Sequence, residues 1–216
     1  MRVIDLSHTL APGMPCYPGT PAPEFHPLST IERDGFSEQL LTLSSHTGTH
    51  VDLPSHILEG GETLDALSPD RFAGAGAVLD LRGVSGGVIS IGQLEPFLPL
   101  LEACDFLLLW TGWDRKWDTP GYFEGYPVLA PEAALWLARF SLKGVGVDAV
   151  SVDREDAAGY PVHAGLLRSG MIIIENLAGL GALPATPFTF CCFPLKIAGA
   201  EASPTRAVAL VNEAGA

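Results

Sequence analysis

The chain of 216 residues is 47% apolar and only 17% charged, and 12 Lys and Arg against 25 Asp and Glu leave a net charge of −13. This composition suits one globular domain, residues 1–216, and excludes a disordered chain. The negative charge disfavours nucleic acid or a membrane as partner. We see no secretory signal and no transmembrane segment. Four cysteines without metal-site or disulfide spacing predict reduced thiols and a cytoplasmic protein.

The first half of the chain predicts mainly β-structure. Residues 2–7 are expected to form the first strand. Residues 11–27 contain six prolines and predict a stiff loop without regular structure. Residues 36–43 alternate in the β manner, and residues 75–81 resemble a buried strand.

Helices and strands alternate in the second half, which predicts a mixed α/β domain with some parallel pairing. The predicted helices are residues 91–103, 131–140 and 165–169. The predicted strands are residues 106–110, 145–150, 171–174, 188–197 and 206–211. Residues 111–127 are interpreted as a loop rich in aromatic residues and glycine.

Residues 46–56, His-Thr-Gly-Thr-His-Val-Asp-Leu-Pro-Ser-His, are the most informative segment. Gly48 and Pro54 argue against a helix. In an extended backbone, four metal-binding side chains share one face: His46, His50, Asp52 and His56. Gly48 would let the backbone curl so that two imidazoles face one point. Two imidazoles and a carboxylate leave room for water, as in a catalytic metal site.

Three further residues each allow two interpretations. His56 is either another metal ligand or a proton shuttle. Glu175 ends an apolar run, where a metal would compensate a buried carboxylate, although it could instead emerge into solvent. His163 on its own is more often structural than functional.

Residues 83–87, Gly-Val-Ser-Gly-Gly, match the nucleophile elbow of serine hydrolases. That elbow needs a helix immediately after the serine, but residues 88–91 predict extended backbone. Ser85 is therefore interpreted as part of a glycine-rich turn.

With these residues assembled, the chain resembles the cyclase family of metal-dependent hydrolases, which includes kynurenine formamidase and isatin hydrolase. The resemblance covers nearly the whole chain and is most specific at residues 46–56. Weaker motifs follow in the same order at residues 4–10, 17–19, 110–114, 147–153, 163, 174–177, 194–197 and 203–207. Thr20 and Asn176 depart from the family pattern, in which Asp and, in the formamidases, Gly are usual.

The resemblance implies an α/β fold of the swivelling β/β/α type, a mixed sheet with flanking helices, and a homodimer or homotetramer. It implies a first metal on His46, His50 and Asp52, and a second completed by His163 and Glu175. The ions would be Zn²⁺ or Mn²⁺, one or two per subunit. His56 matches the general acid/base, and Tyr17 matches a residue that contacts substrate.

The resulting hypothesis is an arylformamidase-like hydrolase of a small amide or cyclic amide, with metal-bound hydroxide as the nucleophile. A cyclase or dehydratase acting on a small carbonyl compound, and a metal-dependent binding protein, remain alternatives. Seven aromatic residues suit either a flat substrate or ordinary packing in the core or between subunits: Tyr17, Trp113, Trp117, Tyr122, Phe123, Tyr126 and Tyr160.

Overall fold

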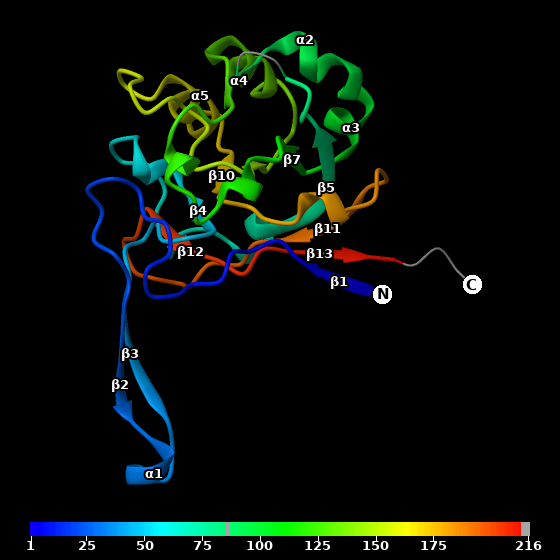
Figure 1. Ribbon diagram of the computed structural model, residues 1–216. Helices are drawn as coiled ribbons and strands as arrows, with labels where there is room; N and C mark the ends of the chain where they lie inside the picture. Colours follow the sequence, from blue (N-terminus) through cyan, green and yellow to red (C-terminus); the bar gives the residue numbers. More distant parts are fainter. Residues whose placement is uncertain (85–86, 213–216) are drawn as a thin grey trace.

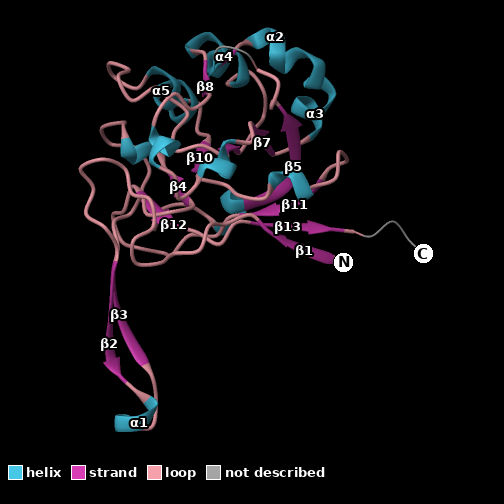
Figure 2. Cartoon of the chain, viewed as in Figure 1, coloured by secondary structure: helices cyan, strands magenta, loops and turns pink. Residues whose placement is uncertain are grey.

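The computed structural model describes residues 1–84 and 87–212, which build a mixed, nine-stranded sheet with helices over one face (Figures 1 and 2). In sheet order the strands are β1 (Arg2–Asp5), β13 (Val208–Val211), β11 (Phe188–Cys191), β5 (Ala73–Asp80), β7 (Phe106–Trp110), β9 (Gly144–Val147), β10 (Ile172–Glu175), β4 (His50–Asp52) and β12 (Ala202–Pro204). The four central strands, β5, β7, β9 and β10, are parallel. The strands on either side pair antiparallel, so the mixed α/β prediction is confirmed.

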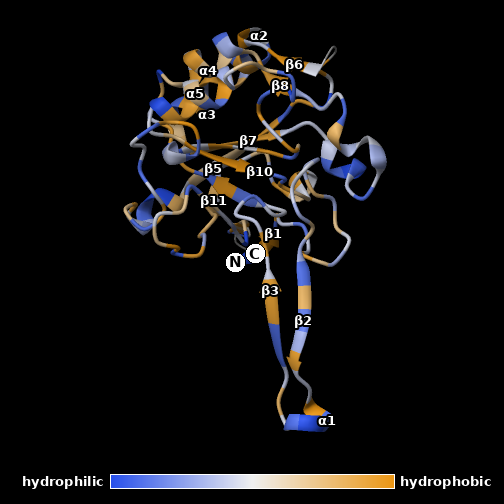
Figure 3. Ribbon diagram, turned by 90° about the vertical axis from the view of Figure 1, so that its left-hand side faces the viewer, coloured by the Kyte–Doolittle hydropathy of each residue, from blue (hydrophilic) through white to orange (hydrophobic). Residues whose placement is uncertain are grey.

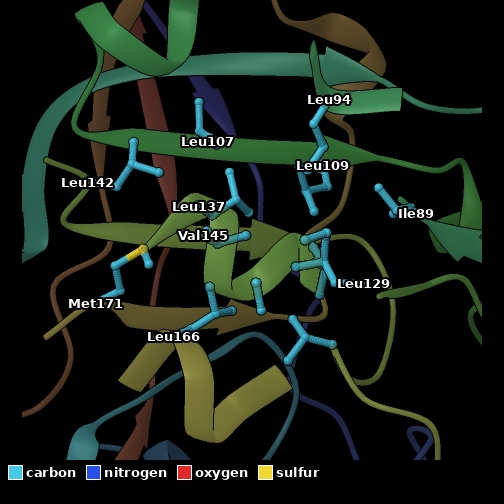
Figure 4. Packing of buried hydrophobic residues seen from close by; sticks show 14 of the residues in the cluster. Ile89, Leu94, Leu107, Leu109, Leu129, Leu137, Leu142, Val145, Leu166 and Met171 are labelled. Carbon is cyan, nitrogen blue, oxygen red and sulfur yellow. The ribbon is translucent and has the colours of Figure 1, made fainter. Parts of the chain in front are cut away.

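Alternation along the strands divides the core between the two faces of the sheet. On β7, Leu107 and Leu109 pack on the helix-covered face, whereas Phe106 and Leu108 pack on the other. The helices are α1 (Ile31–Asp34), α2 (Ile91–Leu94), α3 (Leu98–Ala103), α4 (Pro131–Leu137) and α5 (Pro161–Arg168). Figure 4 shows Leu137 of α4 between Leu107 of β7 and Val145 of β9, and Leu166 of α5 belongs to the same cluster.

Two smaller pairs lie outside the main sheet. Strands β6 (Val88–Ile89) and β8 (Val128–Leu129) pair in parallel. Strands β2 (Glu24–Ser29) and β3 (Glu38–Thr42) form an antiparallel hairpin that projects from the body (Figure 1).

Several predicted boundaries need correction. Part of the predicted loop 11–27 belongs to β2, because Pro27 lies at a register shift in an edge strand, where proline removes no interior hydrogen bond. The predicted helix 91–103 is interrupted by a 3-10 turn, Glu95–Phe97, that contains Pro96. Strand β12 was not predicted, and Ser85 lies outside the described residues. The segment after it is extended, as predicted, in β6.

Candidate metal centre

Strand β4 is the base of the site. His50 and Asp52 are two residues apart in this strand, so their side chains lie on the same face. Glu175 of β10 stands directly opposite His50 in the antiparallel register and joins that face. The His50 Nε2 atom lies 3.3 Å from Asp52 Oδ1 and 3.5 Å from Glu175 Oε2. These three buried groups were predicted from sequence, and the structure brings them together.

The prediction of extended backbone over the whole of residues 46–56 was wrong outside β4. Residues preceding β4 form a turn, and Pro54–His56 forms a 3-10 turn. His46 still reaches the cluster, with its Nδ1 atom 2.8 Å from Asp52 Oδ1. The His56 ring lies with its centroid 4.4 Å from that of His46. The four side chains therefore converge through a curled backbone rather than a straight strand.

Gly48 supplies the curl between His46 and His50. Its φ is +64°, in the left-handed region that glycine adopts without strain. A Cβ atom at this position would stand only 2.6 Å from the Leu10 side chain. Glycine is therefore required both for its backbone conformation and for the space it leaves, and its predicted role as the point of curvature is confirmed.

His163 comes to the same point from the other side. It was expected just before a short helix, but α5 begins earlier, at Pro161, and His163 lies in its first turn. Proline is favourable at that position, where its missing N–H has no helical partner to lose. The His163 Nε2 atom lies 3.3 Å from Glu175 Oε1 and 3.8 Å from Asp52 Oδ2. All five predicted ligands thus face one another.

The chemistry of this cluster fits a divalent cation. Asp52 is fully buried, yet among the described residues neither of its carboxylate oxygens has a hydrogen-bond partner, and His50 Nε2 has none either. Buried polar atoms without partners are costly, and a cation would satisfy them. Two groups hold donor atoms within 4.8 Å of one another: His46, Asp52 and His56, and His50, Asp52 and Glu175. Asp52 belongs to both groups, so the geometry suits one ion or two.

Without a metal ion, burial and neighbouring charges shift the pKa values of the histidines in the cluster. Burial alone would lower the pKa of His50, but the carboxylates of Asp52 and Glu175 overcome it and raise this pKa to about 10. Burial would lower the pKa of His163 as well, but its hydrogen bond to Asp153, together with Asp52 and Glu175, raises this pKa well above the usual value. His56 differs, because partial burial and the neighbouring histidines His46 and His163 lower its pKa. His56 is therefore neutral at pH 7 and free to accept a proton.

Three residues to which sequence reasoning gave no supporting role, Asp153, Glu201 and Asn176, hold the histidine rings. Asp153 Oδ2 accepts a hydrogen bond of 2.8 Å from His163 Nδ1, and Glu201 Oε1 lies 3.4 Å from His46 Nε2. His50 Nδ1 donates to the Gly48 carbonyl at 2.8 Å, and Asn176, with φ +56°, donates its side-chain N–H to the same carbonyl. Such partners set which ring nitrogen faces a cation. No spacing rule could have found them, because most are distant in sequence from the rings that they hold.

A cavity of about 490 Å³ opens onto the cluster. Its aromatic wall comprises Tyr17, Trp117, Phe123, Tyr126 and Tyr160. Trp113 and Tyr122, also expected there, pack instead behind the wall, where Tyr122 is fully buried. The predicted loop 111–127 is anchored by Asp148, which accepts hydrogen bonds from Thr111 and Gly112. Five of the seven aromatic residues thus line the cavity, while Tyr122 and Tyr126 are buried in a hydrophobic cluster and Trp113 packs against it.

Comparisons with known proteins agree with this geometry. A family model named Cyclase, described as "Putative cyclase", matches residues 4–154. Kynurenine formamidase of Erythrobacter litoralis (strain HTCC2594) is 34% identical over 213 residues, which cover 96% of this chain and 93% of that protein. Among solved structures, isatin hydrolase A from Labrenzia aggregata is 26% identical and has a TM-score of 0.87, covering 98% of this chain and 94% of its own. A structure described as a potential metal-dependent hydrolase with cyclase activity is 30% identical, with a TM-score of 0.83 and 98% of both chains covered.

The fold and the site therefore define a metal-dependent hydrolase. The chain belongs to the cyclase family, as its sequence motifs predicted. None of the described helices combines the length and apolar character needed to cross a membrane.

Proposed function

We propose that the chain hydrolyses a small amide or cyclic amide carrying an aromatic group, in an arylformamidase-like reaction, with residues 1–216 acting as one catalytic domain. The observation that carries this proposal is the buried cluster of histidines and carboxylates at the base of an aromatic cavity. The relatives named kynurenine formamidase and isatin hydrolase A support the same substrate class.

The proposed metal ligands are His46, His50, Asp52, His163 and Glu175, holding one or two ions of Zn²⁺ or Mn²⁺. Imidazole and carboxylate donors suit both metals. Such an ion, when bound, supplies Lewis acidity and lowers the pKa of a coordinated water. Asp52 and Glu175 balance much of its charge, which favours release of an anionic product.

The protein's own groups bind the substrate and move the proton. Tyr17 stands edge-on to Phe123, with ring centroids 6.3 Å apart at 90°, and these rings form one wall for a flat substrate. His56, the most exposed member of the cluster, borders the same cavity. Since its lowered pKa leaves it neutral, it accepts the proton of the attacking water and passes it to the leaving nitrogen.

The proposal is tested by elemental analysis of the purified protein and by turnover of N-formyl anilides, isatin-like lactams and simple esters with added Zn²⁺ or Mn²⁺. Replacement of His50 by Ala is expected to abolish both metal content and turnover. Replacement of His56 by Ala should retain metal but lose about 10²- to 10⁴-fold in rate. His26→Ala, an exposed histidine on the projecting hairpin, is the matched control.

Each outcome of this panel has a distinct meaning. Full metal content in His50→Ala would refute its ligand role, and metal loss in His56→Ala would make His56 a ligand rather than the shuttle. Turnover of none of the amides or esters, with metal retained, would reject the hydrolase proposal in favour of a cyclase or dehydratase.

We also propose a cytoplasmic enzyme that assembles as a homodimer or homotetramer and uses a small molecule as its substrate. The unpaired state of Cys16, Cys104, Cys191 and Cys192 supports the reducing compartment. Support for assembly comes from the apolar side chains exposed on the projecting hairpin (Figure 3): Leu28, Ile31, Phe36, Leu40 and Leu41.

A further inference from the structure

Trp117 of the cavity wall stacks on His8, a histidine that has no place in the metal centre. The imidazole and the indole are nearly parallel, with ring centroids 3.8 Å apart and an angle of 8° between the ring planes. Trp117 lines the cavity, whereas His8 is not among the described residues that line it. His8 therefore covers one face of the indole from behind the wall.

Ring stacking sets the orientation of the His8 side chain. Its Nε2 atom is buried without a hydrogen-bond partner in residues 1–84 and 87–212. Burial lowers the pKa of His8, although the carboxylates of Asp114 and Asp118 oppose this shift, so the ring is neutral at pH 7. A neutral imidazole packs on an indole as a flat ring and not as a cation. Another flat ring at position 8 is accordingly expected to support Trp117 equally well.

The backbone of His8 is tied to the segment that carries the proposed metal ligands. Its N–H donates a hydrogen bond of 2.9 Å to Thr49 Oγ1, and the Thr49 hydroxyl donates one of 2.6 Å to the Asn176 carbonyl. Thr49 immediately precedes His50, and Asn176 immediately follows Glu175. The position of His8 is therefore fixed relative to two of the proposed ligands.

Tyr122 holds Trp117 from another side. The two rings meet edge to face, with centroids 4.9 Å apart at 81°, and the Tyr122 hydroxyl donates a hydrogen bond of 2.7 Å to Asn176 Oδ1. Both supports of Trp117 thus lead to Asn176, His8 through Thr49 and Tyr122 directly. A wall connected in this way stands at a fixed place relative to the metal centre, as orientation of a bound substrate requires.

We infer that His8 is a positioning residue for substrate recognition: by stacking on Trp117, it fixes the indole as a flat surface on which the aryl group of the substrate packs. The inference rests on the proposed function for the reaction itself, and it adds how the cavity selects aryl over alkyl groups. Its effect should fall on binding of the aryl group and leave the rate of the chemical step unchanged.

Two hydroxamates test this inference by calorimetry on the Zn²⁺-loaded protein. Benzohydroxamate and acetohydroxamate carry the same metal-binding group but differ in having an aryl ring or a methyl group, so the ratio of their dissociation constants measures recognition of the ring. Wild type is expected to prefer benzohydroxamate. His8→Ala should weaken benzohydroxamate binding about 3- to 10-fold, as for loss of one aromatic contact, and leave acetohydroxamate binding unchanged. His8→Phe should restore the wild-type ratio.

A double-mutant cycle separates an effect through Trp117 from general damage to the fold. If His8 acts through the indole, His8→Ala should weaken benzohydroxamate binding no further in a Trp117→Ala background. Phe140→Ala is the matched control, because it removes a ring that packs on Trp136 with centroids 4.9 Å apart, and neither residue is among the described residues of the cavity lining. It should leave both hydroxamate affinities unchanged.

Acrylamide quenching of tryptophan fluorescence tests the stack without metal or substrate. Loss of the His8 ring uncovers one face of Trp117, so His8→Ala should raise the quenching constant, and His8→Phe should leave it near the wild-type value. In a Trp117→Phe background, His8→Ala should change nothing.

Steady-state kinetics extend the test to the proposed reaction. With an N-formyl anilide as substrate, His8→Ala should raise KM about 3- to 10-fold and leave kcat unchanged, whereas His56→Ala should lower kcat.

The inference is overturned if His8→Ala keeps the wild-type ratio of hydroxamate affinities, or if its effect persists in the Trp117→Ala background. Equal losses for both hydroxamates would also overturn it, because the effect would then lie at the metal centre. Wild type without a preference for the aryl hydroxamate, or unchanged quenching in His8→Ala, would do the same. If no amide is hydrolysed, the proposed reaction fails, while the hydroxamate and quenching results still decide the role of His8.

Discussion

Replacement of Asp153 by Asn should lower both the stability of the fold and the affinity of the site for a metal ion. Asp153 accepts three hydrogen bonds: from the Val162 N–H at 3.0 Å, the His163 N–H at 2.8 Å and His163 Nδ1 at 2.8 Å. An amide has one oxygen to offer. Whichever way it turns, its NH₂ group faces a backbone N–H, which leaves a buried donor unsatisfied and costs about 1–3 kcal/mol.

The same substitution weakens the hydrogen bond that orients the His163 ring. In one orientation the NH₂ group of the introduced amide faces His163 Nδ1, favours the tautomer protonated at Nε2, and directs that proton toward Asp52 and Glu175. Loss of such a supporting carboxylate typically costs about 10- to 100-fold in metal affinity. Competition with a chromogenic chelator measures the affinity, and urea unfolding of the metal-free protein measures the stability. Asp156→Asn, which alters an exposed carboxylate paired with Arg154, is the control.

The two readouts must change together. A metal-free Asp153→Asn protein that is less stable yet binds Zn²⁺ as tightly as wild type would refute the reasoning, because His163 would then be structural and not a ligand. Equal losses in Asp156→Asn would show that charge alone, rather than the bond to the imidazole, is responsible.

Three further predictions concern residues around the cluster. Gly48→Ala should lower the metal affinity and reduce the stability by at least about 1–2 kcal/mol. Alanine is strained in the left-handed conformation of this position, and its Cβ atom would also clash with the Leu10 side chain. An unchanged melting temperature and metal content would contradict this prediction. In the metal-free protein, the raised pKa of His50 keeps it protonated up to about pH 10, against about 6.5 when unfolded. The stability from its charged form is therefore complete below about pH 6.5 and is lost as pH rises toward 10. Binding of Zn²⁺ at pH 7.5 should release the proton of His50, and calorimetry in buffers of different ionisation enthalpy measures this release. Binding without proton release would contradict the raised pKa of His50. Tyr122→Phe should weaken substrate binding more than metal binding, because it removes the 2.7 Å hydrogen bond from the Tyr122 hydroxyl to Asn176. Equal losses in the two affinities would show that this hydrogen bond supports the metal site instead.

The side chains that gather at the site could be predicted from sequence, but the backbone that presents them could not. The rule that alternate residues share a face holds for His50 and Asp52, since β4 is a true strand. For His46 and His56 the same rule reached the correct cluster through the wrong conformation. A left-handed Gly48 and the Pro54–His56 turn replace the straight strand, and local propensity does not reveal how far a chain curls.

Partners distant in sequence explain most of what was missed. Asp153 lies ten residues before the ring it holds, and Glu201 lies 155 residues after His46, so neither has a local signal. Strand β2 of the projecting hairpin was overlooked for another reason: Pro27 masks it, and only the pairing with β3, which was predicted, shows that a strand is there. His163 was expected before its helix because the left-handed Tyr160 that precedes α5 cannot be inferred from residue type.

Strand β4 is only three residues long, yet it is hydrogen-bonded on one side to β10 and on the other to β12. A cation that leaves this cradle does not take the scaffold with it, because the ladder on each flank stays intact. Loss of a cation would therefore leave β4 in place, and rebinding would need no refolding of this strand.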